Sequence, residues 1–130
     1  FKDNSFVSKV ATGDSYILLK DKTSEIKKVA SELKYEDGHP SFLPNNKNIF
    51  VTDVYPKKFN NHIAKLMIYD LTTKSIIIID KLKSNPIYNE TPIRCDLHPK
   101  ISFDGKYVAI DILENETRGI NLYMIKTYKN

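Results

Sequence analysis

The sequence has little cysteine and no tryptophan. Its single cysteine, Cys95, can form no internal disulfide and no cage of thiolate ligands around a metal ion. No uninterrupted apolar run is longer than that from Ile76 to Ile79, whereas a membrane-spanning helix needs about 20 apolar residues. We therefore expect no membrane span and no disulfide framework, and one cysteine leaves the redox compartment open.

A concentrated basic face is also lacking. The net charge is +4, from 20 basic and 16 acidic side chains, but the lysines are spread along the chain. Nucleic-acid binding proteins usually combine a dense basic stripe with interleaved aromatic residues. The sequence also lacks a glycine-rich phosphate loop, a zinc-binding helix motif and a Gly-x-Ser-x-Gly nucleophile elbow. We expect a protein that binds no nucleic acid and whose function no short motif identifies.

Short apolar runs, separated by turn residues, dominate the 130 residues. They are rich in Ile, Val, Tyr and Leu, have the length of strands, and alternate with clusters such as Asp104-Gly105 that are typical of hairpin turns. This pattern predicts an all-β antiparallel meander. The expected strands cover residues 15–20, 48–54, 65–70, 75–80, 107–113 and 120–126. Residues 25–33 have apolar positions at helical spacing, so a short helical turn there is the alternative to a strand.

The clearest pattern is an internal repeat. The residues from His39 to Val51 align without a gap with those from His98 to Ile110, and both copies begin with His-Pro. Residues 64–71 and 120–127 form a second matched pair. Each unit therefore has four strands, of which the first two form a hairpin.

A repeated four-stranded antiparallel unit predicts the blades of a β-propeller, because one blade cannot cover both of its apolar faces and must stack on neighbours. We expect about two and a half blades: a partial blade at 6–31, a complete blade at 40–82, and a C-terminal blade at 99–126 without its outermost strand. Such a set cannot close a ring. The expected partners are the remaining blades of a longer parent chain, of which this is the C-terminal fragment, or further copies of this chain.

The repeated strings resemble a known class of propeller. Residues 40–50 and 101–111 are similar to the Ser-Pro-Asp-Gly-Lys hairpin of TolB-like propeller repeats. Residues 37–42 and 94–99 resemble the C-terminal blades of bacterial propellers of the oligogalacturonate-lyase-like type, which are associated with surface polysaccharide. This resemblance implies an acidic polysaccharide or protein partner and, in a bacterium, a periplasmic or extracellular location. Such relatives are expected to carry a histidine and an Arg-Gln pair after the last blade's second strand, and this chain retains only Arg118.

The two His-Pro steps are also the best candidates for a functional site. The innermost strand of a blade starts near the central channel, so His39 and His98 should lie side by side, with Asp37 and Asp96 at matched positions beside them. Two imidazoles and two carboxylates are enough for an acid-base pair or for a divalent metal ion, although no motif specifies a cofactor. If the protein is an enzyme, His39 and His98 are the candidate catalytic residues.

The candidate substrate-binding residues are different from the candidate catalytic residues. Arg94 has the fork of donors that recognises a carboxylate, and Asp96 is its nearest candidate partner. Asp37, Asp96 and Tyr88 are further candidates, and tyrosines near blade starts (Tyr35, Tyr55 and Tyr88) could stack on sugar rings or close the gap between blades.

Two functions follow from these residues. In a binding or scaffold module linked to carbohydrate, the repeated Asp and His satisfy backbone groups at blade starts. In a polysaccharide lyase or hydrolase, Arg94 holds an acidic sugar while a histidine acts as the base or ligates a metal. Two features favour the binding module. The His-Pro motif repeats in successive blades, and this chain lacks the histidine that the similar propellers are expected to carry.

Overall fold

A computed structural model describes residues 5–9, 16–33, 37–88, 91 and 93–126. Tyr35 and part of the first expected blade lie outside these ranges. The described residues form β-strands and short 3-10 helices, and no helix among them is long and apolar enough to cross a membrane. The elements are β1 (Ser5–Lys9), β2 (Tyr16–Lys20), β3 (Ile26–Val29), η1 (Ser31–Leu33), β4 (Ser41–Leu43), β5 (Asn46–Val54), η2 (Lys58–Asn60), β6 (Ile63–Asp70), β7 (Ser75–Lys83), η3 (Pro86–Tyr88), β8 (Lys100–Ile101), β9 (Tyr107–Glu114) and β10 (Thr117–Met124).

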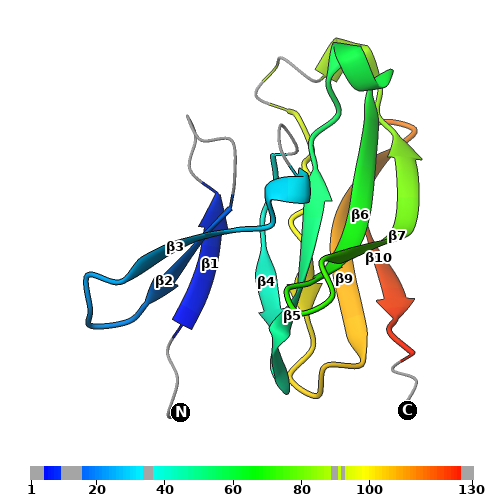
Figure 1. The fold of residues 1–130 in the computed structure, drawn as a ribbon. Coiled ribbons are helices and arrows are strands. Elements are labelled where there is room, and N and C mark those ends of the chain that lie inside the picture. The colour runs from blue at the N-terminus through cyan, green and yellow to red at the C-terminus, as the bar shows by residue number, and fades with distance from the viewer. Residues whose placement is uncertain (1–4, 10–15, 34–36, 89–90, 92, 127–130) are drawn as a thin grey trace.

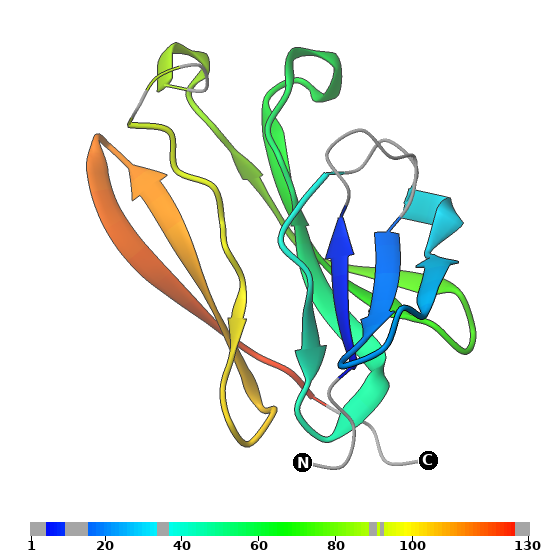
Figure 2. The same ribbon diagram turned by 90° about the vertical axis from the view of Figure 1, so that its left-hand side faces the viewer.

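The strands form three antiparallel meanders, as Figure 1 shows. Their strand orders are β1-β2-β3, β4-β5-β6-β7 and β10-β9-β8. The four-stranded sheet lies between the two three-stranded sheets (Figure 2). The predicted fold class is confirmed: the chain is all-β, a propeller fragment of one four-stranded blade flanked by two smaller sheets. The segment with helical spacing contains both a strand, β3, and a helical turn, η1.

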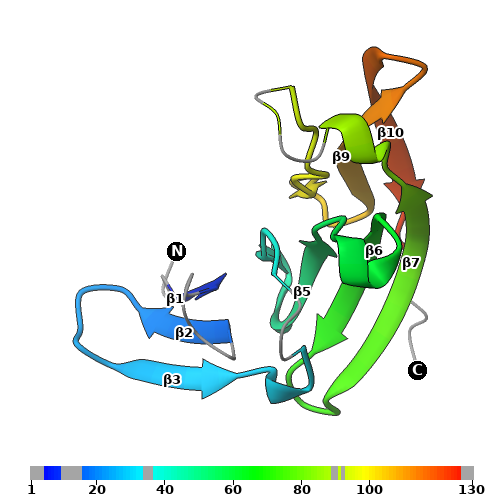
Figure 3. The ribbon, with the colours of Figure 1, turned by 90° about the horizontal axis from the view of Figure 1, so that it is seen from above.

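The first strands of the three sheets are neighbours. β1 lies beside β4, and β4 lies beside β8, so the sheets meet along one common edge and fan out from it, as the view from above shows (Figure 3). β4 and β8 are the strands that follow the two His-Pro steps. This arrangement brings the two steps, far apart in sequence, to one place in the fold.

The two repeated hairpins differ by one residue, so the gap-free alignment is wrong in its second half. Ser41 pairs with Val51, whereas Lys100 pairs with Ala109, which leaves one residue fewer in the second hairpin. The second matched pair, residues 64–71 with 120–127, is also displaced. Phe50 pairs with Tyr69 and Val108 pairs with Tyr123, so Tyr69 and Tyr123 occupy equivalent positions in the two sheets. The cause is the shorter connection between β9 and β10.

The two equivalent tyrosines make the same kind of contact. Each donates its hydroxyl to a carboxylate, Tyr69 to Glu32 and Tyr123 to Asp80, both at 2.6 Å.

Two apolar clusters hold the three sheets together. β5 is buried on both faces, with Phe50 on one side and Val51 on the other. The cluster shared with the β1–β3 sheet is formed by Tyr16, Ala30, Leu33, Phe50, Val54, Met67 and Tyr69. The cluster shared with the β8–β10 sheet is formed by Leu43, Val51, Ala64, Leu66, Leu97, Val108 and Ile110. Continuous burial of this kind is expected of a strand that is covered on both faces.

Phe50 is the centre of the first cluster. Its ring lies 5.5 Å from that of Tyr16 and 5.3 Å from that of Tyr69, and its side chain is fully buried. We expect Phe50→Ala to lower the free energy of unfolding by about 3–5 kcal/mol, because it removes apolar contacts and leaves a cavity. Denaturant unfolding followed by circular dichroism measures this. Phe103→Ala is the matched control, because Phe103 is 88% exposed and should change stability by less than about 0.5 kcal/mol. Equal effects of the two substitutions would contradict the packing described here.

Candidate functional site

The neighbouring first strands bring the two histidines into contact. The rings of His39 and His98 are tilted by 41° to each other, and their centroids are 4.0 Å apart. His39 comes two residues before β4, and His98 comes two residues before β8. The side-by-side placement expected from the repeat is therefore what the structure has.

A buried carboxylate links the two strand starts. Asp53, near the end of β5, is fully buried. It accepts the backbone N–H of His39 at 2.5 Å through Oδ1 and the backbone N–H of His98 at 3.3 Å through Oδ2. The Nδ1 of His39 also lies 3.1 Å from Oδ2. One side chain thus satisfies two N–H groups that no sheet ladder pairs, which is what a buried charge requires.

The backbone of Gly38 approaches Asp53 closely. A Cβ at this position would overlap the carbonyl oxygen of Asp53 and lie 2.9 Å from its carboxylate Oδ1. Only glycine leaves room for that approach. Gly38 therefore allows the next residue, His39, to reach the Asp53 carboxylate.

The contacts of His39 define its tautomer. Its Nδ1 faces the Asp53 carboxylate, which can only accept a hydrogen bond, and its Nε2 lies 3.0 Å from the hydroxyl of Tyr55. Burial, together with the charges of Asp53, Asp96 and Asp37, raises the pKa of Tyr55 to about 12, so its hydroxyl stays protonated and can donate. In the neutral ring the proton sits on Nδ1, and Nε2 carries the lone pair.

His98 has a related arrangement with a different backbone. Its Nδ1 lies 3.2 Å from the carbonyl oxygen of Asp96 and 3.7 Å from Oδ2 of Asp111, so this nitrogen also carries the proton in the neutral ring. Its φ is 42°, in the left-handed region that few residues other than glycine adopt. With the hairpins aligned on their pairing, Asp111 is the counterpart of Asp53. Each histidine therefore has an aspartate from the second strand of its own sheet.

Asp96 completes the cluster. It is buried, and its Oδ2 accepts two hydrogen bonds from Arg94, from Nε at 3.1 Å and from Nη2 at 2.7 Å. Its Oδ1 is buried without a hydrogen-bond partner among the described residues. One carboxylate oxygen of Asp96 and one ring nitrogen each of His39 and His98 lie within 4.8 Å of one another. Of the described residues, these three form the group with the donors and spacing of a metal site.

Arg94 is held from two sides. Its side chain is 45% exposed, and its guanidinium lies over the ring of Tyr55, with 5.3 Å between the guanidinium carbon and the ring centroid. Arg118 on β10 donates to the backbone carbonyls of Ile93 and Arg94. The arginine that the family resemblance singled out therefore supports the loop that carries Arg94.

The other sequence candidates are not members of this three-residue group. Asp37 is 4.0 Å from the ammonium of Lys57, and its backbone carbonyl accepts from Tyr55. Tyr88 donates its hydroxyl to Glu116 in the β9–β10 turn. Burial raises the pKa of the Cys95 thiol, which disfavours the thiolate that a nucleophile would need. Sequence reasoning missed Asp53, because its match with Asp111 appears only when the two hairpins are aligned on their strand pairing.

Comparisons with known proteins do not assign the chain to a family. No protein-family model matches the sequence, and searches of curated proteins and of solved structures found no match. The resemblance to TolB-like and oligogalacturonate-lyase-like propellers therefore stays an expectation, and the geometry of the cluster is the basis for a functional proposal.

The close approach at Gly38 gives a direct test of the Asp53 link. We expect Gly38→Ala to lower the free energy of unfolding by about 2 kcal/mol or more, because a methyl group would force the His39 segment away from Asp53. Gly119→Ala is the matched control, since its nearest atoms, from Ile112, would lie at an ordinary 3.5 Å. Thermal unfolding of both variants measures the difference. Two variants as stable as the parent protein would show that the Asp53 link does not hold the strand starts.

Proposed function

We propose that this chain is a β-propeller module that binds a divalent metal ion through His39, His98 and Asp96 and binds an acidic carbohydrate beside it. Two observations carry the proposal: Oδ1 of Asp96 is buried without a hydrogen-bond partner among the described residues, and one carboxylate oxygen of Asp96 lies within 4.8 Å of a ring nitrogen of each imidazole. A buried carboxylate oxygen without a donor is costly, and a cation satisfies it. A purely structural role for the cluster leaves this oxygen unexplained.

The histidine tautomers support the same proposal. Both rings place Nδ1 against an acceptor, so the lone pair of each ring is on Nε2. In metal sites, a ligating histidine usually donates its other ring N–H to a carboxylate or a backbone carbonyl, which fixes its orientation and increases its basicity. Asp53 and the Asp96 carbonyl are such partners. A metal on Nε2 of His39 would replace the hydroxyl of Tyr55.

The donor set indicates the metal class. Two imidazoles and one carboxylate favour Zn²⁺ and similar transition metals over Mg²⁺ and Ca²⁺, which prefer all-oxygen sites. Three protein ligands also leave a coordination position open for a ligand oxygen.

Metal titration tests the site. Isothermal titration calorimetry with Zn²⁺ should show one ion per chain, and His98→Ala should weaken this binding by about 100-fold because it removes a ligand. Asp53→Asn should weaken it by about 10–100-fold, through loss of the carboxylate that orients His39. Affinity should also fall on acidification, since metal ligands must be deprotonated.

His62→Ala is the control for this titration. His62, between η2 and β6, is outside the three-residue cluster, so its removal should leave Zn²⁺ binding unchanged. Equal affinities of the His98→Ala and His62→Ala variants would contradict the proposed site, as would a parent protein that binds no Zn²⁺.

Arg94 supports an acidic ligand next to the metal. Its Nε and Nη2 bind Asp96, while Nη1 has no partner within the described parts of the chain, and almost half of the side chain is exposed. A guanidinium with a free donor beside a metal site suits a carboxylate, which can bind both. An acidic sugar with a carboxylate on its ring has the required chemistry.

Carbohydrate binding is measured with an oligogalacturonate in the presence of Zn²⁺. Arg94→Ala should weaken binding by about tenfold or more, because a charge-assisted hydrogen bond is lost. A neutral oligosaccharide of the same length is the control and should not bind. Unchanged affinity in Arg94→Ala would contradict the role of Arg94.

A lyase is the second candidate, favoured by the half-exposed imidazole of His98, which contacts Asp96, the partner of Arg94, and could act as a base. Unsaturated sugar products, detected by their ultraviolet absorbance in the same mixtures, would favour the lyase over the binding module.

A further inference from the structure

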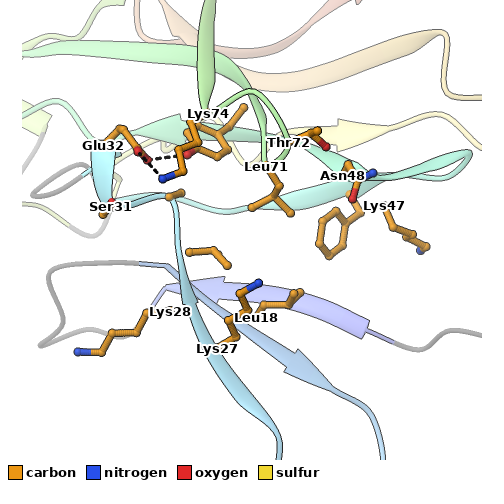
Figure 4. A pocket seen from close by; sticks show the side chains of 14 residues that line it. Leu18, Lys27, Lys28, Ser31, Glu32, Lys47, Asn48, Leu71, Thr72 and Lys74 are labelled. Carbon is orange, nitrogen blue, oxygen red and sulfur yellow. Dashed lines mark hydrogen bonds and ion pairs between the residues drawn. The ribbon is translucent and has the colours of Figure 1, made fainter.

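A second site lies between the β1–β3 sheet and the β4–β7 sheet. A cavity of about 690 Å³ opens there, within the range of small-molecule sites. Leu18 and Lys27 line it from one sheet, and Leu71 and Thr72 line it from the other (Figure 4). None of the residues of the His39–Asp96–His98 cluster lines this cavity.

Lys27 lies on the face of β3 that is turned toward the β4–β7 sheet, and its side chain is exposed at the cavity. In the β2–β3 ladder, Tyr16 pairs with Val29 and Leu18 pairs with Lys27, so these four side chains share one face of the sheet. Tyr16 and Val29 on that face pack into the core with the β4–β7 sheet. Ile26, on the opposite face, is 65% exposed. Ile26 therefore points away from the cavity, whereas Lys27, which is also exposed to solvent, points toward it (Figure 4).

The cavity has a surplus of positive charge. Four of its lining residues are lysines and one is a glutamate, Glu32. The Glu32 carboxylate lies 3.9 Å from the ammonium of Lys74 and accepts the hydroxyl of Tyr69 at 2.6 Å. The Tyr69 hydrogen bond lowers the pKa of Glu32, which therefore stays ionised. Lys27 forms no ion pair among the residues that the structure describes, and its neighbour Lys28 lies on the opposite face of β3.

The remaining lining is apolar and aromatic. Phe42, Leu18 and Leu71 contribute apolar surface, and the ammonium of Lys47 lies 5.8 Å from the centre of the Phe42 ring. Figure 4 shows Lys27 pointing into the space between the sheets, Lys47 at one side of this space, and Lys28 pointing away from it. A ligand that matches this lining has an anionic group for Lys27 and a body that can lie against Phe42.

We infer that this cavity binds a small phosphorylated molecule, such as a sugar phosphate, with its phosphate at Lys27. Lysine is a compact point charge that binds phosphate readily, and the described lining holds lysines and no arginine. A phosphate monoester carries between one and two negative charges near neutral pH, which the lysine surplus matches. This site is independent of the proposed metal site, because the two share no residue.

Calorimetric titration with glucose 6-phosphate in the presence of EDTA tests the inference. Binding should be saturable at one molecule per chain, and glucose should not bind. Lys27→Glu should weaken binding by about tenfold or more, because a charge-assisted contact is replaced by a repulsive one. Lys27→Leu should also lose binding while the protein stays at least as stable, since an apolar side chain fits that face of β3.

Two controls distinguish binding in this cavity from general charge attraction and from binding at the metal site. Lys22→Glu, in the β2–β3 turn outside the cavity lining, makes the same change of charge and should retain binding within about twofold. His98→Ala should bind glucose 6-phosphate like the parent protein, even if it loses Zn²⁺. Equal losses in Lys22→Glu and Lys27→Glu would overturn the inference. A parent protein that does not bind glucose 6-phosphate would overturn it too. The role left for Lys27 would then be that of a charged residue that prevents the edge strand β3 from pairing with a strand of another chain.

Discussion

The hydrogen bonds of Asp53 are the interaction on which the candidate site depends. This buried carboxylate lies on a strand of the middle sheet and accepts the backbone N–H groups of residues that begin two different sheets. Burying a charge is costly unless it is fully hydrogen-bonded, and three donors around Asp53 meet that cost. The same bonds hold His39 and His98 against each other. The feature that stabilises the junction of the two sheets therefore also sets the geometry of the proposed metal site.

The two histidines have different environments although they occupy the same place in the repeat. His39 is enclosed between Asp53 and Tyr55, whereas His98 is more exposed, has a left-handed backbone, and lies farther from Asp111. Strained non-glycine residues concentrate at functional sites, where surrounding contacts hold them in place. A motif that served only to satisfy strand starts would be expected to repeat its geometry. The asymmetry, together with the unpartnered oxygen of Asp96, supports a functional role for the second copy.

Much of the fold could be predicted from sequence, because strand periodicity and the His-Pro repeat are local patterns. The repeat also predicted that His39 and His98 are neighbours, since equivalent strands of adjacent blades lie side by side. Asp53 was missed because it lies beyond the gap-free alignment, which ends at Val51, and because the same register would place Ile112 opposite it. The missing residue in the second hairpin is visible only in the strand pairing. Asp37 and Asp96 occupy matched positions in the sequence, but their contacts differ. Asp37 lies near Lys57 whereas Asp96 binds Arg94, because identical residue types in the two repeats have different neighbours. The sequence did not single out Lys27, because the face of β3 that is turned toward the cavity is decided by the register of β3 with β2.

The junction that Asp53 organises is, in our proposal, a metal site. A crystal structure of the protein with Zn²⁺, with anomalous scattering recorded at the zinc edge, tests this most directly. We expect an anomalous peak bound by Nε2 of His39, Nε2 of His98 and Oδ1 of Asp96, with both Nδ1 atoms still facing their present acceptors. A junction without an anomalous peak, in which His39 keeps its hydrogen bond to Tyr55, would contradict the proposal.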